Sequence, residues 1–237
     1  MLGRFLEWSI ATPDIRASMD FYVRLGFSET EVGEAWRHPY AVMTDGRVCL
    51  GLHQEADFPS SLTFVKPDLL AHLGQLEALG LEFEIRRLGN DVFNEVGWHD
   101  PAGHLIRLVE ARTFSPSKRK PLDSGACGYF AGIGLPVSDA DTAKAFWERI
   151  GFVGMEEPTS ALPHVACTSD SIDLGLYLPA QLPAPTLLFE VENIEKTRAE
   201  IAVRGVTPSG RVPGSLKASA ILLHAPEGTP ILIQSVS

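Results

Sequence analysis

The sequence predicts an α+β protein built from four β-α-β-β-β modules in two similar halves. Three observations support this fold class. The chain of 237 residues repeats itself at a shift of 125 positions, which aligns Asp14 with Asp139 and Gly26 with Gly151. Each of the four expected helices ends in a glycine followed by an apolar residue, and each half carries a Pro-x-Gly turn before its last strand. One shift that aligns sites along a whole half indicates an internal duplication.

In the first half, strands are predicted where apolar residues alternate, or run together, between turn residues. They cover residues 4–11, 40–44, 47–53, 62–65, 82–87, 94–99 and 104–110. The dipeptide Asp45-Gly46 predicts a hairpin between the second and third of these strands. Helices follow the first and fourth strands. Thr12 is expected to cap the first helix, with Pro13 at its first helical position.

The second half repeats this order, and its predicted strands cover residues 130–137, 164–168, 172–178, 186–191, 218–223 and 230–235. We therefore expect one domain over residues 1–113 and another over 127–237. The linker, about 114–126, contains Ser-Pro and Lys-Arg-Lys. A sheet made of two such modules curls into a cup with helices outside, and its concave face is a natural pocket.

Composition narrows the function classes. The net charge is −10, which argues against nucleic-acid binding because the phosphate backbone repels such a surface. Three cysteines are too few for a disulfide framework, which favours the reducing cytoplasm. No apolar run reaches the length of a membrane span. We expect a cytoplasmic monomer or homodimer whose partner is a small organic molecule, with no nucleic acid and no membrane.

Two motifs carry a resemblance to a known superfamily. Pro13-Asp14-x6-Phe21-Tyr22-x3-Gly-Phe follows the first strand, and Asp100-Pro-x-Gly precedes the last strand of the first half. This pattern resembles the vicinal oxygen chelate superfamily, which includes glyoxalase I, bleomycin-resistance proteins, extradiol dioxygenases and fosfomycin-resistance enzymes. The resemblance covers nearly the whole chain, as two glyoxalase-like domains. It implies the cup-shaped fold but leaves the chemistry open, because its members share architecture and differ in function.

The resemblance also implies four inward strand positions for metal ligands. In this sequence they are Glu7, Gly51, Ser61 and Arg107 in the first half, and Gly132, Gly175, Thr186 and Leu232 in the second. A divalent ion needs three or four converging N, O or S donors, and neither set supplies them. We therefore expect no metal and no other cofactor. The alternatives are a metal held by other ligands or a clip formed by His99, His104 and Asp100.

The first cup remains polar at these inward positions. Glu7 and Arg107 are expected to form an ion pair, either structural or with Arg107 gripping an anionic group of a ligand. Together with His53, a possible general base, they are the candidate catalytic residues. Other candidates surround the cup. Trp36, His38, Tyr40 and Arg107 are the candidate ligand-binding residues, and the first three form a wall suited to a planar molecule.

Two functions fit this site. The first is a metal-free protein that binds a small, partly apolar organic molecule, as in resistance or sequestration. The second is an enzyme of the lyase, isomerase or dioxygenase-like type. It would act without metal through Glu7, His53 and Arg107, or with a metal at unorthodox ligands. The inward positions of the second half carry almost no metal-ligating or charged side chains. This favours one working site, in the first domain, with the second domain as scaffold.

Overall fold

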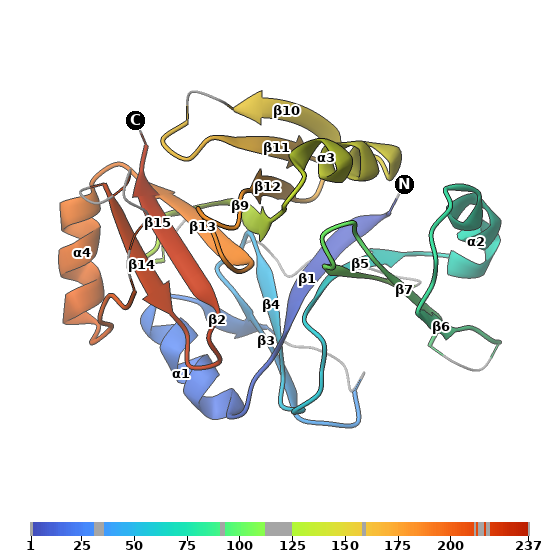
Figure 1. Ribbon diagram of the computed structural model, residues 1–237. Coiled ribbons are helices and arrows are strands. Elements are labelled where there is room, and N and C mark those ends of the chain that lie inside the picture. The colour runs from blue at the N-terminus through green and yellow to red at the C-terminus, as the bar shows by residue number, and fades with distance from the viewer. Residues whose placement is uncertain are drawn as a thin grey trace.

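The computed structural model describes residues 2–30, 36–90, 93–111, 125–157, 160–210, 212, 216 and 219–236. Figure 1 shows two sheets at the centre of the molecule and the helices towards its periphery. Among the described residues, every strand pairs within its own half, which gives one mixed sheet of eight strands and one of seven. Both sheets are open. The predicted α+β class and the two sheets with four helices are confirmed.

The elements of the first half follow the predicted order. They are β1 (Arg4–Ala11), α1 (Ile15–Arg24), β2 (Ser28–Thr30), β3 (Tyr40–Thr44), β4 (Cys49–His53), β5 (Ser61–Lys66), α2 (Leu69–Ala78), β6 (Ile85–Arg87), β7 (Glu95–His99) and β8 (Leu105–Glu110). Their order across the sheet is β2-β3-β4-β1-β5-β8-β7-β6. The first strands of the two modules, β1 and β5, therefore lie side by side at the centre.

The second half has the same plan. Its elements are β9 (Tyr129–Pro136), α3 (Ala140–Arg149), β10 (Val153–Glu157), β11 (His164–Thr168), β12 (Asp173–Tyr177), β13 (Thr186–Val191), α4 (Ile194–Val203), β14 (Ala220–His224) and β15 (Pro230–Ser235). Their order across the sheet is β10-β11-β12-β9-β13-β15-β14. Within the described part of the chain, the last module contributes two strands after its helix.

The repeat extends to strand pairing. β1 runs parallel to β4 and antiparallel to β5, and β9 runs parallel to β12 and antiparallel to β13. Both central antiparallel pairs contain a register shift, between Phe5 and Glu7 in the first half and between Leu188 and Phe189 in the second. Because register decides which side chains face the cup, equivalent residues of the two halves occupy equivalent inward positions.

One helix cap differs from the sequence prediction. Asp14, and not Thr12, is the N-cap of α1, and its carboxylate accepts from the backbone N–H groups of Arg16 and Ala17. Thr12 instead bonds Ser18, hydroxyl to hydroxyl at 2.8 Å. The repeat carries the signal that was missed, because Asp139 is the N-cap at the equivalent position of α3. Hydrogen bonds from Thr142 lower the pKa of the Asp139 carboxyl.

Two strands were not predicted, β2 and β10. Both lie at a sheet edge and pair with one neighbour, β3 and β11 respectively. β2 has only the three residues Ser-Glu-Thr, so it carries no hydrophobic alternation by which a strand is recognised. Its pairing comes from the neighbouring strand rather than from its own sequence.

The backs of the two sheets share one hydrophobic core. A single cluster of buried side chains contains Trp8 and Phe64 from the first half and Phe152 and Phe189 from the second. Trp8 therefore packs on the face of β1 opposite Glu7. Helix α1 packs against β2–β4 and α3 against β10–β12. The two halves are thus joined through their convex faces, and each concave face points away from the joint.

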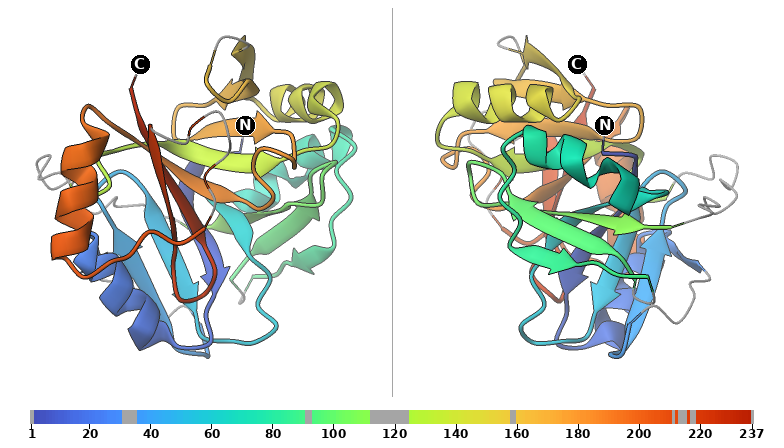
Figure 2. Two further views of the ribbon diagram at one scale, coloured as in Figure 1. Left: turned by 60° about the vertical axis from the view of Figure 1, so that its left-hand side comes forward. Right: turned by 90° about the vertical axis from the view of Figure 1, so that its right-hand side faces the viewer.

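Contacts between the helices reinforce this joint. The views in Figure 2 place α4 next to α1, and the Arg204 guanidinium donates to the carbonyl of Arg24 at 3.2 Å. Ala126 N–H donates to the carbonyl of Leu25 at 2.8 Å. The rest of the predicted linker, up to residue 124, lies outside the described residues, so the domain boundaries remain predictions. No described helix has the length and apolar character needed to cross a membrane.

Candidate functional site

The concave face of the first sheet gathers buried polar side chains. Register places Glu7 opposite Thr63, and Thr63 opposite Arg107, on the neighbouring strands β1, β5 and β8. His53 at the end of β4 is fully buried, and Glu7 is only 2% exposed. Buried polar groups of this kind require hydrogen-bond partners, so their contacts define what the cup can do. We call this concave face the first cup.

Glu7 is held by two hydroxyl groups. Ser9 donates to its Oε1 at 2.7 Å, and Tyr40 donates to its Oε2 at 2.5 Å. Ser9 is itself bonded to Thr63 at 2.8 Å. Burial, followed by the nearby charge of Glu7, raises the pKa of Tyr40, so Tyr40 stays a hydrogen-bond donor. Both carboxylate oxygens of Glu7 are thus occupied as acceptors.

His53 lies at the centre of an aromatic cluster. Its ring stacks on Phe58 with centroids 3.7 Å apart and an 8° angle between the planes. Trp36 meets it edge-on, with centroids 5.0 Å apart. The Nδ1 atom contacts Nε2 of His38 at 2.8 Å. The Nε2 atom faces Oε1 of Glu7 at 3.6 Å and is buried without a hydrogen-bond partner among the described residues.

The predicted ion pair between Glu7 and Arg107 is not formed. The Arg107 guanidinium instead donates from Nη1 to Glu95 Oε1 at 2.8 Å. Glu95 lies on β7, which pairs directly with β8, whereas β5 separates Glu7 from Arg107. The Nε atom of Arg107 is buried and, within the described part of the chain, has no hydrogen-bond partner. It is the second such polar atom in the cup.

The three predicted wall residues do lie together. Trp36, His38 and Tyr40 all contact the His53 ring. The structure adds Phe58, from the segment between β4 and β5, to these residues. Its ring lies against His53 and 4.8 Å from the Arg107 guanidinium carbon. Phe58 is 7% exposed, so it closes the cup over these two side chains.

Burial affects the charge of two side chains in the cup, His53 and Arg107. It lowers the pKa of His53, and the neighbouring carboxylate of Glu7 only partly opposes this effect. It also lowers the pKa of Arg107, against the raising effect of Glu95. A desolvated imidazole favours its neutral form, so His53 has one ring nitrogen free to accept a proton.

The second cup has the same backbone and different contents. Its residues at the inward positions and in the surrounding loops form an apolar cluster of Leu162, Tyr177, Leu182, Leu188, Leu216, Ala220 and Leu232. Gly132 stands where the first cup has Glu7, and Leu232 where it has Arg107. A side chain at Gly134 would contact Leu182 and Tyr177 at once. Among the described residues, the second cup therefore has no counterpart of the Glu7 carboxylate or the Arg107 guanidinium, although the hydroxyl of Thr186 is buried at one of its inward positions.

Comparison with known proteins identifies the architecture. No protein-family model matches the sequence, and no curated protein is similar to it. Among solved structures, a catechol 2,3-dioxygenase matches with a TM-score of 0.63 and 14% identity, over 99% of this chain and 88% of the other. The 2,3-dioxygenase LapB from Pseudomonas sp. KL28 matches with a TM-score of 0.63 and 16% identity, over 99% and 92%. The homoprotocatechuate 2,3-dioxygenase from Arthrobacter globiformis matches with a TM-score of 0.64 and 16% identity, over 99% of this chain and 80% of the other.

This chain has the extradiol dioxygenase fold. The predicted resemblance to the vicinal oxygen chelate superfamily is confirmed at the level of fold. At these identities the likeness concerns the fold alone, and a fold hosts many chemistries. The function must therefore be argued from the cups.

The extradiol dioxygenase fold raises the question of a metal, and the residues at the implied positions do not fit one. Glu7 already accepts from Ser9 and Tyr40, and Arg107 is a cation. Gly51 has no side-chain donor, and a Cβ at this position would clash with Glu7 Oε1, so a ligand residue there would require the Glu7 carboxylate to move. Among the residues that the structure describes, no group of three His, Cys, Asp or Glu side chains is placed to hold a metal ion.

The histidines at the β7–β8 turn have separate partners. His99 Nδ1 contacts Glu84 at 2.9 Å, and His104 Nδ1 contacts Asp100 at 2.9 Å. The turn explains the second contact, because Asp100 also accepts from the backbone N–H groups of Ala102 and His104. His99 and His104 therefore do not converge with Asp100 to form the metal clip considered above.

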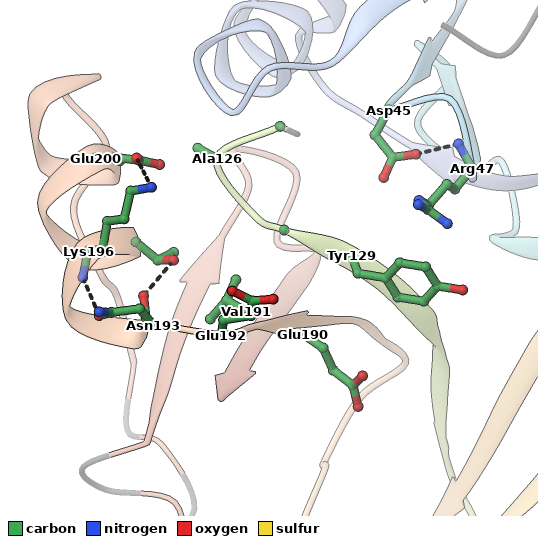
Figure 3. Close-up of a pocket in the computed structure, with 13 residues that line it drawn as sticks. Asp45, Arg47, Ala126, Tyr129, Glu190, Val191, Glu192, Asn193, Lys196 and Glu200 are labelled. Atoms are coloured by element: carbon green, nitrogen blue, oxygen red, sulfur yellow. Dashed lines mark hydrogen bonds and ion pairs between the residues drawn. The ribbon is translucent and has the colours of Figure 1, made fainter. Parts of the chain in front are cut away.

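A cavity of about 440 Å³ lies outside both cups, between the two halves (Figure 3). The two cations among its lining residues already have partners. Arg47 lies over the Tyr129 ring at 4.0 Å, and Lys196 lies 3.9 Å from Glu200. None of its described lining residues has a buried polar side-chain atom without a hydrogen-bond partner. Five buried side-chain atoms of the described residues lack a hydrogen-bond partner; those of His72, Trp98 and Trp147 lie on three separate elements, α2, β7 and α3, and the first cup is the candidate site because it holds two, His53 Nε2 and Arg107 Nε.

Proposed function

We propose that the first cup binds a small, partly apolar organic molecule without a divalent metal. The observation that carries this proposal is the pair of unsatisfied polar atoms, His53 Nε2 and Arg107 Nε, buried beside the aromatic rings of Trp36 and Phe58. A buried polar atom without a partner costs about 1–3 kcal/mol. A ligand oxygen on Arg107 and a ligand hydroxyl on His53 would remove that cost.

Phe58 defines where the apolar part of this molecule binds. Its ring fills the space between the His53 imidazole and the Arg107 guanidinium. A ligand ring that displaces Phe58 would gain the same stacking and cation–π contacts. The flanking residues of the segment, 54–57 and 59–60, are exposed, so Phe58 can move out without displacing another buried side chain of that segment.

This arrangement supports our proposal of a sequestering or resistance type of function, and we propose that the protein is cytoplasmic. The cup offers shape, stacking and an anion-binding group, which suffice to hold a molecule. The second half, whose cup is filled by its own apolar side chains, would serve as scaffold.

A second candidate, an enzyme that transfers protons without metal, is favoured by the environment of His53. Its neutral ring faces the Glu7 carboxylate in a site closed to water, which is the setting of a general base. The reaction would then be of the lyase or isomerase type. Binding remains the first proposal, because it needs only the two unsatisfied atoms and the rings around them.

The test combines binding with stability. Arg107→Leu leaves Glu95 buried without its main partner and should lower the free energy of unfolding by about 3–5 kcal/mol. The double variant Arg107→Leu/Glu95→Ala reproduces Leu232 and Ala220 of the second cup and should recover most of that stability. Ligand-observed NMR with benzoate and 4-nitrophenol should detect binding to the parent and to neither variant.

Arg47→Leu is the matched control, because it removes a cation that lies outside the cup, over Tyr129. It should leave the binding of both compounds unchanged. Binding by the double variant as strong as by the parent would place the site elsewhere.

Titration with Zn²⁺, Mn²⁺ or Fe²⁺ should show no tight binding to the parent. Stoichiometric metal that disappears in Glu7→Ala would contradict the metal-free proposal.

A further inference from the structure

A line of three side chains connects the first cup to its rim. His53 Nδ1 lies 2.8 Å from His38 Nε2, and His38 Nδ1 lies 3.1 Å from Glu55 Oε2. Exposure rises along this line, from 0% for the side chain of His53 to 14% for His38 and 53% for Glu55. The line therefore joins a group sealed from solvent to one in contact with it.

The carboxylate at the outer end sets the direction of these hydrogen bonds. An ionised Glu55 only accepts, so Nδ1 of His38 carries the proton and donates to it. In a neutral His38, Nε2 then has a lone pair and accepts from Nδ1–H of His53. A neutral His53 is left with an unprotonated Nε2, which is the atom that lacks a partner in the cup.

That unprotonated nitrogen faces a second acceptor. Glu7 Oε1 lies 3.6 Å from His53 Nε2 and already accepts from Ser9. Two lone pairs facing each other in a buried site are unfavourable unless a donor lies near both. The missing group is therefore a hydroxyl on the ligand, with Arg107 close enough to affect the charge on His53.

We propose that Glu55, His38 and His53 form a proton relay that ionises a weakly acidic hydroxyl of the bound molecule. This rests on the proposed function, because it assigns the ligand of the same cup. The ligand O–H bond breaks and its proton passes to His53 Nε2, while the proton on Nδ1 passes to His38 Nε2. The electron pair stays on the ligand oxygen, opposite the cation of Arg107. His38 becomes a cation beside Glu55. His53 is the base, and His38 and Glu55 position its protons.

The relay solves a problem of charge. Glu7, His38, Tyr40 and Arg107 surround the His53 ring. A proton that stayed on His53 would create a cation that burial disfavours and that the charge of Arg107 opposes, and the Glu7 carboxylate offsets these effects only in part. Moving the charge to His38 places it next to a carboxylate at the rim. The second cup contains none of the three relay residues. In this part of the chain the repeat has a shift of 124, and Leu162, Tyr177 and Pro179 take the positions of His38, His53 and Glu55.

The experiment reads the proton positions directly, without a ligand. In ¹⁵N-labelled parent protein at neutral pH, two-bond ¹H–¹⁵N correlation spectra should show His38 and His53 as neutral rings protonated on Nδ1. Glu55→Gln replaces an acceptor by an amide that can also donate, so His53 should lose its single tautomer and show protonation on Nε2. Glu84→Gln is the matched control. It alters the carboxylate beside His99 and should leave the His53 signals unshifted.

Protonation of His53 on Nε2 in the parent would overturn the relay, as would equal effects of Glu55→Gln and Glu84→Gln. A second measurement tests the ligand class with 4-nitrophenol, whose absorbance distinguishes phenol from phenolate. The parent should bind it as phenolate, and Glu55→Gln should lower the ratio of bound phenolate to bound phenol about tenfold, equivalent to one pKa unit. Failure to bind, or binding as neutral phenol, would overturn the ligand class, while the tautomer measurement decides the relay independently of binding.

Discussion

His53 illustrates how burial determines the behaviour of one residue. Burial lowers the pKa of its imidazole in the folded protein. In the unfolded chain the ordinary value is about 6.5. As the pH falls, the unfolded state therefore takes up this proton first. The stability associated with neutral His53 is fully present above about pH 6.5 and is lost as the pH falls below it towards the folded-state pKa.

We predict that His53→Phe reduces the acid sensitivity of the protein. The variant keeps a planar ring against Phe58 and removes the group that must stay neutral. Urea unfolding of parent and variant from about pH 7.5 to about pH 5.5 should show a smaller fall in the free energy of unfolding for the variant. An identical fall in both proteins would mean that His53 does not carry this dependence.

Arg107 shows how far the sequence predicts a site at this scale. The resemblance to the superfamily implies inward positions for Arg107 and Glu7, and both are buried. It does not choose between carboxylates on the same face. Glu95 is the partner because β7 pairs with β8, and strand order across the sheet is a tertiary property. The pairing could be derived only once the complete sheet order was known.

At the scale of elements, the segment between β4 and β5 matters most. Exposed polar residues dominate it, so its sequence indicates a surface loop. Phe58 points inward nevertheless, and the repeat contains the signal that was missed. Leu182 occupies the equivalent place, at a shift of 124, and is buried in the second cup. Each cup is thus closed by one apolar side chain from the same loop, over polar groups in the first and over apolar groups in the second.

Removing the Phe58 ring should therefore open the first cup. We predict that Phe58→Ala lowers the free energy of unfolding by about 3 kcal/mol, because it leaves a cavity above His53 and Arg107. The same variant should bind 4-nitrophenol more tightly than the parent, since the ligand no longer displaces the ring. Chemical denaturation and absorbance titration measure the two effects.

Leu182→Ala is the matched control for this loop. It should lower stability by a similar amount, about 2–3 kcal/mol, because Leu182 is also buried. It should not increase phenol binding, since the buried residues that cluster with it are Tyr177 and aliphatic side chains, with no counterpart of His53 or Arg107. Equal gains in binding for the two variants would indicate that any cavity takes the compound and that the polar groups of the first cup play no part.

At the scale of the molecule, the repeat in the sequence predicted the order of elements but not how the halves meet. A shift of 125 positions aligns residues within each half and contains no information about contacts between them. The structure shows that Glu227, in the turn between β14 and β15, reaches helix α1. It accepts from Tyr22 and Ser18, each at 2.6 Å. The equivalent contact is not repeated, because Ala102 replaces Glu227 and Trp147 replaces Tyr22.

This single carboxylate should therefore hold the two halves together more strongly than exposed contacts do. Tyr22 is fully buried, and burial followed by the charge of Glu227 raises its pKa, so it stays a donor. Glu227→Ala removes its charged acceptor, and we predict a loss of about 1–3 kcal/mol in the free energy of unfolding. Hydrogen exchange should accelerate in α1 and in the turn at 225–229, and not in α3.

Two further variants separate the hydrogen bond from the general contact between the halves. Tyr22→Phe combined with Glu227→Ala should be more stable than Glu227→Ala alone, because no hydroxyl is then left buried without its acceptor. Arg204→Gln removes the exposed bond to Arg24 and should change stability by less than about 0.5 kcal/mol. Because one hydrophobic core spans both sheets, all of these proteins should unfold in a single calorimetric transition. Two resolved transitions in Glu227→Ala would show instead that this carboxylate, and not the shared core, makes the halves unfold together.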